Sequence, residues 1–154
     1  MPNMRPPCRK YTLAILVAAV GFLAACSSSN LADPTTYPVT GLVTFEGSPV
    51  DGALVVLRPK ANDGATTAQA TTDAEGIFDV HIFLEMGKRT KRGLMPADYQ
   101  IEVTQLVKAT GEASIFSPPK NMLPEKYASV QTSGLETTVS AESKNELVLE
   151  LSNQ

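Results

Sequence analysis

The chain has 154 residues, with 13 Lys and Arg against 16 Asp and Glu, so its net charge at pH 7 is -3. An acidic chain is a poor candidate for a nucleic-acid partner, because phosphates attract basic surfaces. With two cysteines and one histidine, we expect a fold that depends on packing and not on disulfides. The length suffices for one domain with a core.

The first 25 residues have the features of a secretion signal. Basic side chains precede an apolar run over residues 11–23, and the small residues Ala24 and Ala25 follow it. This order is typical of a cleaved signal peptide. The run is shorter than the roughly 20 residues that a membrane-spanning helix needs, so we expect no permanent anchoring by the peptide itself. The sequence therefore predicts export and removal of residues 1–25.

A cysteine follows the small residues directly, in "LAAC" at 23–26. This motif resembles the lipobox of bacterial lipoproteins; the alternative is an ordinary signal peptide followed by a cysteine by chance. The resemblance implies a diacylglyceryl group on the sulfur of Cys26, cleavage before it, and acylation of the freed amine with fatty acids such as palmitate. Each buried methylene contributes about 0.8 kcal/mol, so two or three chains hold a protein on a membrane almost permanently. In lipoproteins of cells with two membranes, an aspartate directly after the lipidated cysteine is associated with retention in the inner membrane. This chain has Ser27 at that position, so the resemblance implies the outer membrane.

Residues 26–37 follow as the lipidated cysteine and a predicted tether. This segment lacks apolar periodicity and is rich in Ser, Thr, Asn, Asp and Pro, a composition typical of flexible linkers. We therefore expect one folded domain over 38–154, held close to the bilayer.

Within 38–154, apolar and polar residues alternate with a period of two, as in strands with one buried face. The alternation predicts strands over 39–46, 53–57, 77–84, 99–104 and 146–151, with shorter candidates at 67–72 and 137–140. Turn-forming stretches such as "EGSPVDG" and "TDAEG" separate them, and we find no convincing helical pattern. The sequence therefore predicts an all-β fold, an antiparallel sandwich of about seven strands.

Five stretches together carry a resemblance to a known family: 39–59, 71–80, 95–104, 123–127 and 132–151. They resemble the carboxypeptidase regulatory-like domain, a transthyretin-like (prealbumin-like) Greek-key sandwich common in bacterial surface lipoproteins. The resemblance implies this fold and a cell-surface location, and no particular activity. The family usually has Pro-Gly before the tyrosine of the fifth strand, where this chain has Pro96, Ala97 and Asp98. We therefore expect a different turn, with Asp98 bonding its own backbone.

His81 is the first candidate for catalysis. Strand alternation places it on the face opposite Phe78 and Val80, so we expect an exposed side chain. One histidine cannot build the His-rich metal or nucleophile sites that catalysis usually needs. Two related groups of sandwich enzymes, the hydroxyisourate hydrolases and the intradiol dioxygenases, use sets of His, Arg and Tyr that this sequence lacks. We expect no catalytic residues; an enzyme with an unfamiliar site is the least favoured alternative.

The carboxylates of "TDAEG" are the candidates for metal binding. A calcium loop of the EF-hand type would continue to a distant glutamate, whereas here Ile77 begins the next strand at once. A hairpin turn explains Asp73 and Gly76 without a metal. We therefore expect neither a metal nor a cofactor.

The stretch "KRTKR" concentrates positive charge in an acidic domain, with Lys88, Arg89, Lys91 and Arg92 in a predicted loop. One interpretation is a solvated loop. The other is contact with anionic lipid headgroups or an acidic polymer, worth at most about 1 kcal/mol per charge near a membrane.

The long connection 111–129 contains apolar residues, among them Phe116, Met122 and Tyr127. Long loops in compact domains are often functional. One interpretation is that these side chains pack over an open end of the sandwich. The other is that Phe116, Met122 and Tyr127 contact a protein partner.

Together these observations predict a non-enzymatic, lipid-anchored, extracytoplasmic module at the cell envelope, structural or protein-binding, with an unknown envelope protein as its partner. The alternative is a binding domain for carbohydrate or another envelope polymer. The absence of Trp and the 6% aromatic content count against this alternative, because aromatic rings usually supply the stacking surface for sugars.

Overall fold

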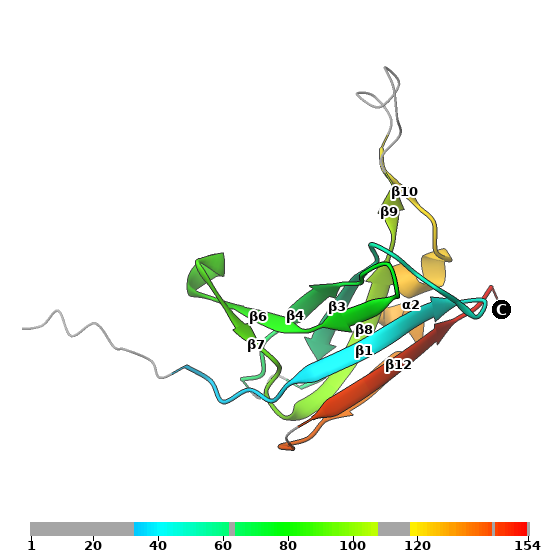
Figure 1. Ribbon diagram of the computed structural model, residues 1–154. Helices are drawn as coiled ribbons and strands as arrows, with labels where there is room; N and C mark the ends of the chain where they lie inside the picture. The colour runs from blue at the N-terminus through cyan, green and yellow to red at the C-terminus, as the bar shows by residue number, and fades with distance from the viewer. Residues whose placement is uncertain (1–32, 62–63, 108–117, 143, 154) are drawn as a thin grey trace, which may run out of the picture. The chain divides into compact units, whose positions relative to one another are not determined.

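The structure is a computed structural model that describes residues 33–61, 64–107, 118–142 and 144–153 (Figure 1). From Pro34 on, the chain forms one compact unit. Cys26 and the predicted signal peptide lie outside the described residues.

The larger sheet has six strands, and every neighbouring pair in it is antiparallel. Its order is β11 (Leu135–Val139), β8 (Ala97–Thr104), β3 (Leu54–Pro59), β4 (Ala68–Thr71), β6 (His81–Leu84) and β7 (Arg89–Arg92).

The smaller sheet has four strands built around β1 (Val39–Phe45). Its other members are β12 (Asn145–Leu151), β2 (Ser48–Pro49) and β5 (Ile77–Asp79). β2 and β5 pair with β1 in the antiparallel sense, but β12 pairs with it in parallel (Figure 1). This parallel pair is an exception within the predicted antiparallel sandwich. A separate ribbon joins β9 (Leu106–Val107) and β10 (Lys120–Asn121).

The core lies between the two sheets and consists of the inward half of the alternating pattern. Fully buried side chains come from both sheets, for example Val43 from β1 and Val55 and Ile101 from β3 and β8. Because strands such as β4, β8 and β12 bury every second residue, their apolar side chains fill the space between the sheets. The predicted all-β sandwich is confirmed.

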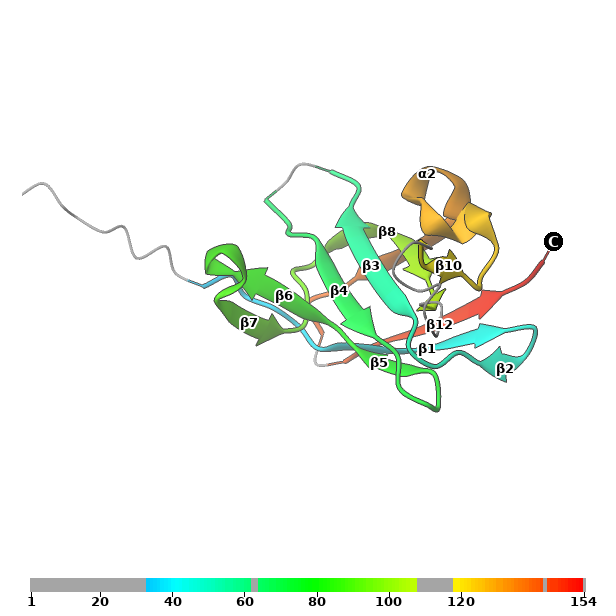
Figure 2. The same ribbon diagram turned by 90° about the horizontal axis from the view of Figure 1, so that it is seen from above.

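The strand predicted over 77–84 divides between the two sheets at Val80. β5 pairs with β1, whereas β6 pairs with β4 and β7 (Figure 2). Val80 lies between them, fully buried; its N–H donates to Val39 O at 3.0 Å, and its carbonyl accepts from Gly93 N at 2.7 Å. The alternation continues through the division, so Phe78, Val80 and Ile82 all enter the core.

In the part of the chain that the structure describes, three short helical segments interrupt the strands, where the sequence shows no helical pattern. They are the 3-10 segments η1 (Glu85–Gly87) and η3 (Glu125–Ala128) and the α-helix α2 (Val130–Ser133). α2 begins after Ser129, whose hydroxyl accepts from Gln131 N, and ends at Gly134, with φ 64°. A single turn is too short to display a 3.6-residue period, which explains why the pattern does not predict it.

The tyrosine of β8 fixes the entry to its strand. Tyr99 is fully buried, and its hydroxyl donates to Met95 O, four residues upstream, at 2.9 Å. This arrangement is that of a tyrosine corner. Asp98 does not bond its own backbone as expected: its carboxylate accepts from the hydroxyl of Thr138, its cross-strand partner on β11. Ala97 already belongs to the strand, so no turn occurs there.

The end of the predicted tether belongs to the domain. Tyr37 and Leu94 exchange backbone hydrogen bonds of 2.8 and 2.9 Å, and the hydroxyl of Thr36 donates to Arg92 O at 2.8 Å. The prediction of a tether through residue 37 is wrong at this end, because these backbone groups pair with the turn after β7.

Candidate functional site

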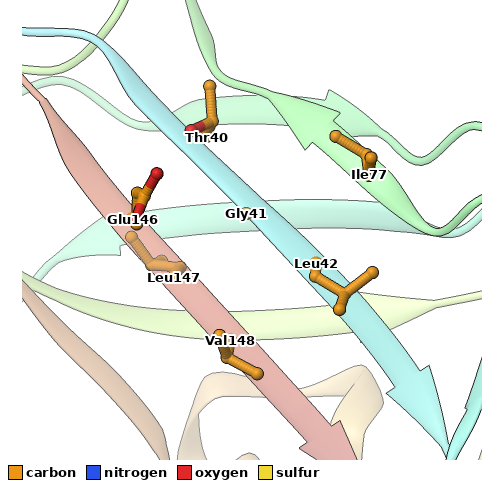
Figure 3. Close-up of a pocket in the computed structure, with 7 residues that line it drawn as sticks. All are labelled: Thr40, Gly41, Leu42, Ile77, Glu146, Leu147 and Val148. Carbon is orange, nitrogen blue, oxygen red and sulfur yellow. The ribbon is translucent and has the colours of Figure 1, made fainter.

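The outer face of the smaller sheet carries three apolar side chains in line across three strands. Leu42 on β1 is the register partner of both Ile77 on β5 and Val148 on β12. Ile77 is 50% exposed and Val148 65%, with Leu42 half-buried between them (Figure 3). We call these three residues the apolar row.

A shallow hollow of about 220 Å³ adjoins the apolar row, with Thr40, Gly41, Glu146 and Leu147 completing its lining (Figure 3). Gly41 is essential to the packing beneath it. A Cβ at position 41 would lie 2.4 Å from Cζ of Phe78 and 2.8 Å from Leu147 O. The ring of Phe78 therefore fills the space on the core side of Gly41.

Carboxylates flank the apolar row on β12. Glu146 and Glu150 lie on either side of Val148 along the same outer face, and all three are exposed. Glu146 forms an ion pair with Lys144, itself exposed. The apolar row is therefore bordered by acidic side chains along its β12 edge.

The strand pattern of the sequence does not by itself predict this face. Leu42, Ile77 and Val148 each stand at an outward position of the alternating pattern, where a polar residue is usual. That exception is visible in the sequence. Their alignment depends on the register of β5 and β12 on β1, which strand patterns do not give.

Tyr127 is not a surface contact, so its predicted role in binding a partner is wrong. It is only 5% exposed, because η3 folds the ring against the core. Its hydroxyl donates to Ser152 O at 3.2 Å and accepts from Ser152 N at 3.0 Å. Leu123 is buried too, so for this part of the connection the interpretation of packing over the sandwich is correct.

The surroundings of Tyr127 also affect its ionisation. Burial of the ring raises the pKa of the phenol, whereas hydrogen bonding to Ser152 and the ammonium of Lys126 lower it, and the net effect is a pKa below the usual value. The ammonium lies 4.7 Å from the ring centroid. A phenolate at this position is stabilised by both groups.

Met122 is 52% exposed and follows β10, beside the exposed Leu106 and Val107 of β9. It stays a candidate for partner contact. Phe116 lies outside the described residues.

The stretch "KRTKR" is a strand and not the predicted loop. Arg89–Arg92 form β7, which pairs with β6 at the edge of the larger sheet. Charged side chains are a common feature of edge strands, because they discourage pairing with other chains. Lys91 donates to Pro34 O at 2.6 Å and so helps to hold the start of the domain.

The two arginines of β7 pair with carboxylates of the same chain. Arg89 Nη1 lies 2.9 Å from Glu85 Oε1, and Arg92 Nε lies 2.7 Å from Asp79 Oδ2. Lys88 precedes the strand and is exposed. Neutralised arginines attract external anions less strongly, so these pairs weaken the case for contact with lipid headgroups.

His81 is half-buried and not exposed as expected. Its Nδ1 lies 3.1 Å from Asp79 O. A polar hollow of about 450 Å³ adjoins it on the outer face of the larger sheet, lined by Gln69, Ala70, Thr71, Asp79, His81, Phe83 and Thr90. Phe83 is 41% exposed there, so this hollow combines one aromatic ring with several hydrogen-bonding side chains.

The "TDAEG" stretch forms the predicted hairpin turn. Asp73 Oδ1 accepts from Glu75 N at 3.1 Å and Ile77 N at 2.7 Å, and Gly76 has φ 77°. A Cβ on Gly76 would lie 2.6 Å from Val43 O. Among the described residues, no three His, Cys, Asp or Glu side chains are placed to hold a metal ion.

Within the described ranges, no helix combines the length and hydrophobicity needed to cross a membrane.

No family model and no curated protein matches the chain. Among solved structures, the chain is similar to a DUF3823 family protein from Parabacteroides merdae, with 14% identity and a TM-score of 0.40, over 77% of this chain and 47% of that one. It is also similar to a 9R-lipoxygenase from Cyanothece, with 12% identity and a TM-score of 0.39, over 80% of this chain and 18% of that one. The chain thus spans less than half the length of either protein.

Proposed function

We propose that this protein is a bacterial lipoprotein with a carboxypeptidase regulatory-like sandwich, anchored outside the cytoplasm by lipid on Cys26. In a cell with two membranes, the anchor lies in the outer one. The domain catalyses no reaction and binds another protein of the envelope.

The apolar row is the observation that carries the protein-binding part of the proposal. Ile77, Leu42 and Val148 form a continuous apolar line across three strands, with Glu146 and Glu150 beside it. Apolar surface rimmed by polar groups is typical of protein interfaces. The face is also built on rigid strands, so it is formed before a partner arrives.

Cross-linking in intact cells tests the binding proposal. A photoreactive amino acid at position 42 is expected to capture a specific envelope protein. The change Val148→Lys should remove that product, because it puts a charge into the apolar row. The matched variant Phe83→Lys, on the outer face of the larger sheet, should retain it. An unchanged product in the Val148→Lys variant would contradict the proposal.

The anchor is tested separately with Cys26→Ser. A hydroxyl is a far weaker nucleophile than a thiolate near neutral pH, so we expect the variant to persist as the longer precursor or to be released as soluble protein. Wild-type protein should partition into detergent and have the mass of a chain that begins at Cys26 with acyl groups attached. A wild-type chain that begins at Ser27 or later and carries no lipid would overturn the anchor.

A second candidate function is binding of carbohydrate or another envelope polymer. The polar hollow supports it, because an exposed ring at Phe83 lies beside Gln69, Thr71 and His81. Aromatic rings stack on sugars, and amide, hydroxyl and imidazole groups bond their hydroxyls. Co-sedimentation with isolated envelope polysaccharide is then expected for wild type and for Val148→Lys, and its loss for Phe83→Ala. Equal co-sedimentation of Phe83→Ala and wild type would exclude this hollow.

A further inference from the structure

The strand β12 has an open backbone edge. Its two end residues, Asn145 and Leu151, bond to the residues that flank β1: Asn145 N donates to Pro38 O at 3.1 Å, and Leu151 O accepts from Glu46 N at 3.0 Å. Backbone groups of successive residues in a strand point to opposite edges. The N–H and C=O groups of Glu146, Val148 and Glu150 therefore point away from β1, where no described strand pairs with them.

Tyr127 marks where this open edge ends. Ser152 is the next residue in the same outward series, and the hydroxyl of Tyr127 bonds both its N–H and its C=O. The phenol thus occupies the place that the backbone of a neighbouring strand would take. Within β12, the open edge comprises Glu146, Val148 and Glu150.

The side chains of the same three residues point to the outer face of the sheet. Their order is acidic, apolar, acidic, and Val148 belongs to the apolar row. In a strand added at this edge, side chains directly opposite would lie about 5 Å away at the Cβ atoms. Opposite charges at these positions stabilise a strand pair, and like charges destabilise it.

We propose that the protein partner adds an extended segment to β12. The segment places an apolar residue beside Val148, a Lys or Arg beside Glu150, and a Lys or Arg beside Glu146 that replaces the exposed ion pair of Glu146 with Lys144. Main-chain hydrogen bonds supply affinity, and the alternate side chains supply specificity. This inference rests on the proposed function, since it specifies how the protein partner binds.

A second copy of this chain fits the edge less well. An antiparallel pair of β12 strands centred on Val148 would place Glu146 of each copy opposite Glu150 of the other. Like charges directly opposite each other are destabilising, and the chain as a whole is acidic. A basic segment of another protein avoids the repulsion between glutamates and is attracted to the acidic chain.

The test uses the full-length protein in detergent and two labelled peptides built around the sequences KTVTK and ETVTE. Wild type is expected to bind KTVTK about tenfold more tightly than ETVTE, and less tightly as salt rises. The double variant Glu146→Lys/Glu150→Lys should reverse this preference. The control Glu102→Lys/Glu136→Lys makes the same change of charge on the larger sheet and should leave the wild-type preference.

The backbone is tested with Val148→Pro. Proline lacks the N–H that the added strand would accept from, and this N–H is not used by β1, so the fold is expected to tolerate it. Binding of KTVTK should fall about tenfold or more. Equal binding of the two peptides by wild type, or no reversal in the double variant, would overturn the proposal. Dimers that dissociate on Val148→Pro would assign the edge to a second copy and would overturn it too.

The two proposals fail in different ways. If cross-linking at position 42 captures an envelope protein in cells but neither peptide binds, strand addition is wrong and the binding function stands. If no protein is captured, the binding function itself is wrong.

Discussion

The two sheets of the sandwich bury the same kind of surface but present different outer faces. On the larger sheet, outward side chains pair with one another: Arg58 Nη2 lies 3.0 Å from Glu102 Oε1, and Lys60 Nζ lies 2.5 Å from Glu136 Oε2. On the smaller sheet, the apolar row has no such partners across the strands. The same alternation of buried and exposed residues can therefore produce an outer face whose charged side chains pair with one another, or an outer face whose apolar side chains are suited to a protein partner.

The largest expected effect is loss of packing beneath the apolar row. Gly41→Val should destabilise the domain by about 3 kcal/mol, because its Cβ and methyl groups would collide with the ring of Phe78. Thr40→Val, next to it but facing outward, should change the free energy of unfolding by less than about 0.5 kcal/mol. Urea unfolding of both variants measures the difference. Equal stabilities would show that the two sides of β1 do not differ as described.

Each sheet is associated with a tyrosine whose hydroxyl bonds the backbone: Tyr99 on β8 of the larger sheet, and Tyr127, which bonds the residue after β12 of the smaller sheet. Tyr127→Phe removes the hydrogen bonds to Ser152, and Tyr99→Phe removes the one to Met95 O. Each should cost about 1 kcal/mol. In addition, Tyr127→Phe extends the open edge of β12 and should tighten binding of the KTVTK peptide, since unprotected edges pair with other chains. Tighter peptide binding by Tyr99→Phe instead would assign the peptide-binding edge to the larger sheet.

Charge pairs on the larger sheet should contribute little to folding. Both partners of the Arg58–Glu102 pair retain exposed surface, so Glu102→Gln is expected to cost about 0.5 kcal/mol or less. A double-mutant cycle with Arg58→Met measures the coupling, which should diminish in high salt. A coupling free energy well above about 1 kcal/mol that salt does not change would mean that the charge pairs on this face contribute substantially to the stability of the fold.

The smallest effect concerns the ionisation of Tyr127. Lys126→Met removes the nearby positive charge, so the pKa of Tyr127 should rise. Because the folded state lowers this pKa, Tyr127 stabilises the fold fully only above its unfolded pKa and loses this contribution as pH falls through the folded pKa. In the Lys126→Met variant, the free energy of unfolding should therefore increase less at high pH. Ultraviolet titration of the phenolate measures the pKa, and an unchanged value would exclude the role of Lys126.

Much of the fold follows from alternation in the sequence. The pattern at 99–104 and 146–151 predicts which side chains enter the core, and the structure confirms them as parts of β8 and β12. The turn at Asp73 follows from local chemistry, in which a carboxylate accepts from the backbone two and four residues on. These features depend on residues close together in the chain.

The features that the sequence did not predict depend on distant residues. The high charge of Arg89–Arg92 is typical of a loop, but this segment is a strand because it pairs with β6. Tyr127 looks like an exposed loop residue until its contact with Ser152 is known. The apolar row requires the register of three strands that are far apart in the sequence.

The parallel pairing of β1 with β12 has a kinetic consequence. Asn145 Nδ2 bonds Pro38 O at 3.3 Å across a separation of 107 residues, so the smaller sheet is incomplete until β12 has left the ribosome. Contacts of such long range slow folding, because the chain must close a large loop before the pair forms. A nascent chain that lacks 145–151 therefore has β1 with one side unpaired. Completion of the smaller sheet therefore depends on the synthesis of β12, long after β1 and its other neighbours β2 and β5 have been made.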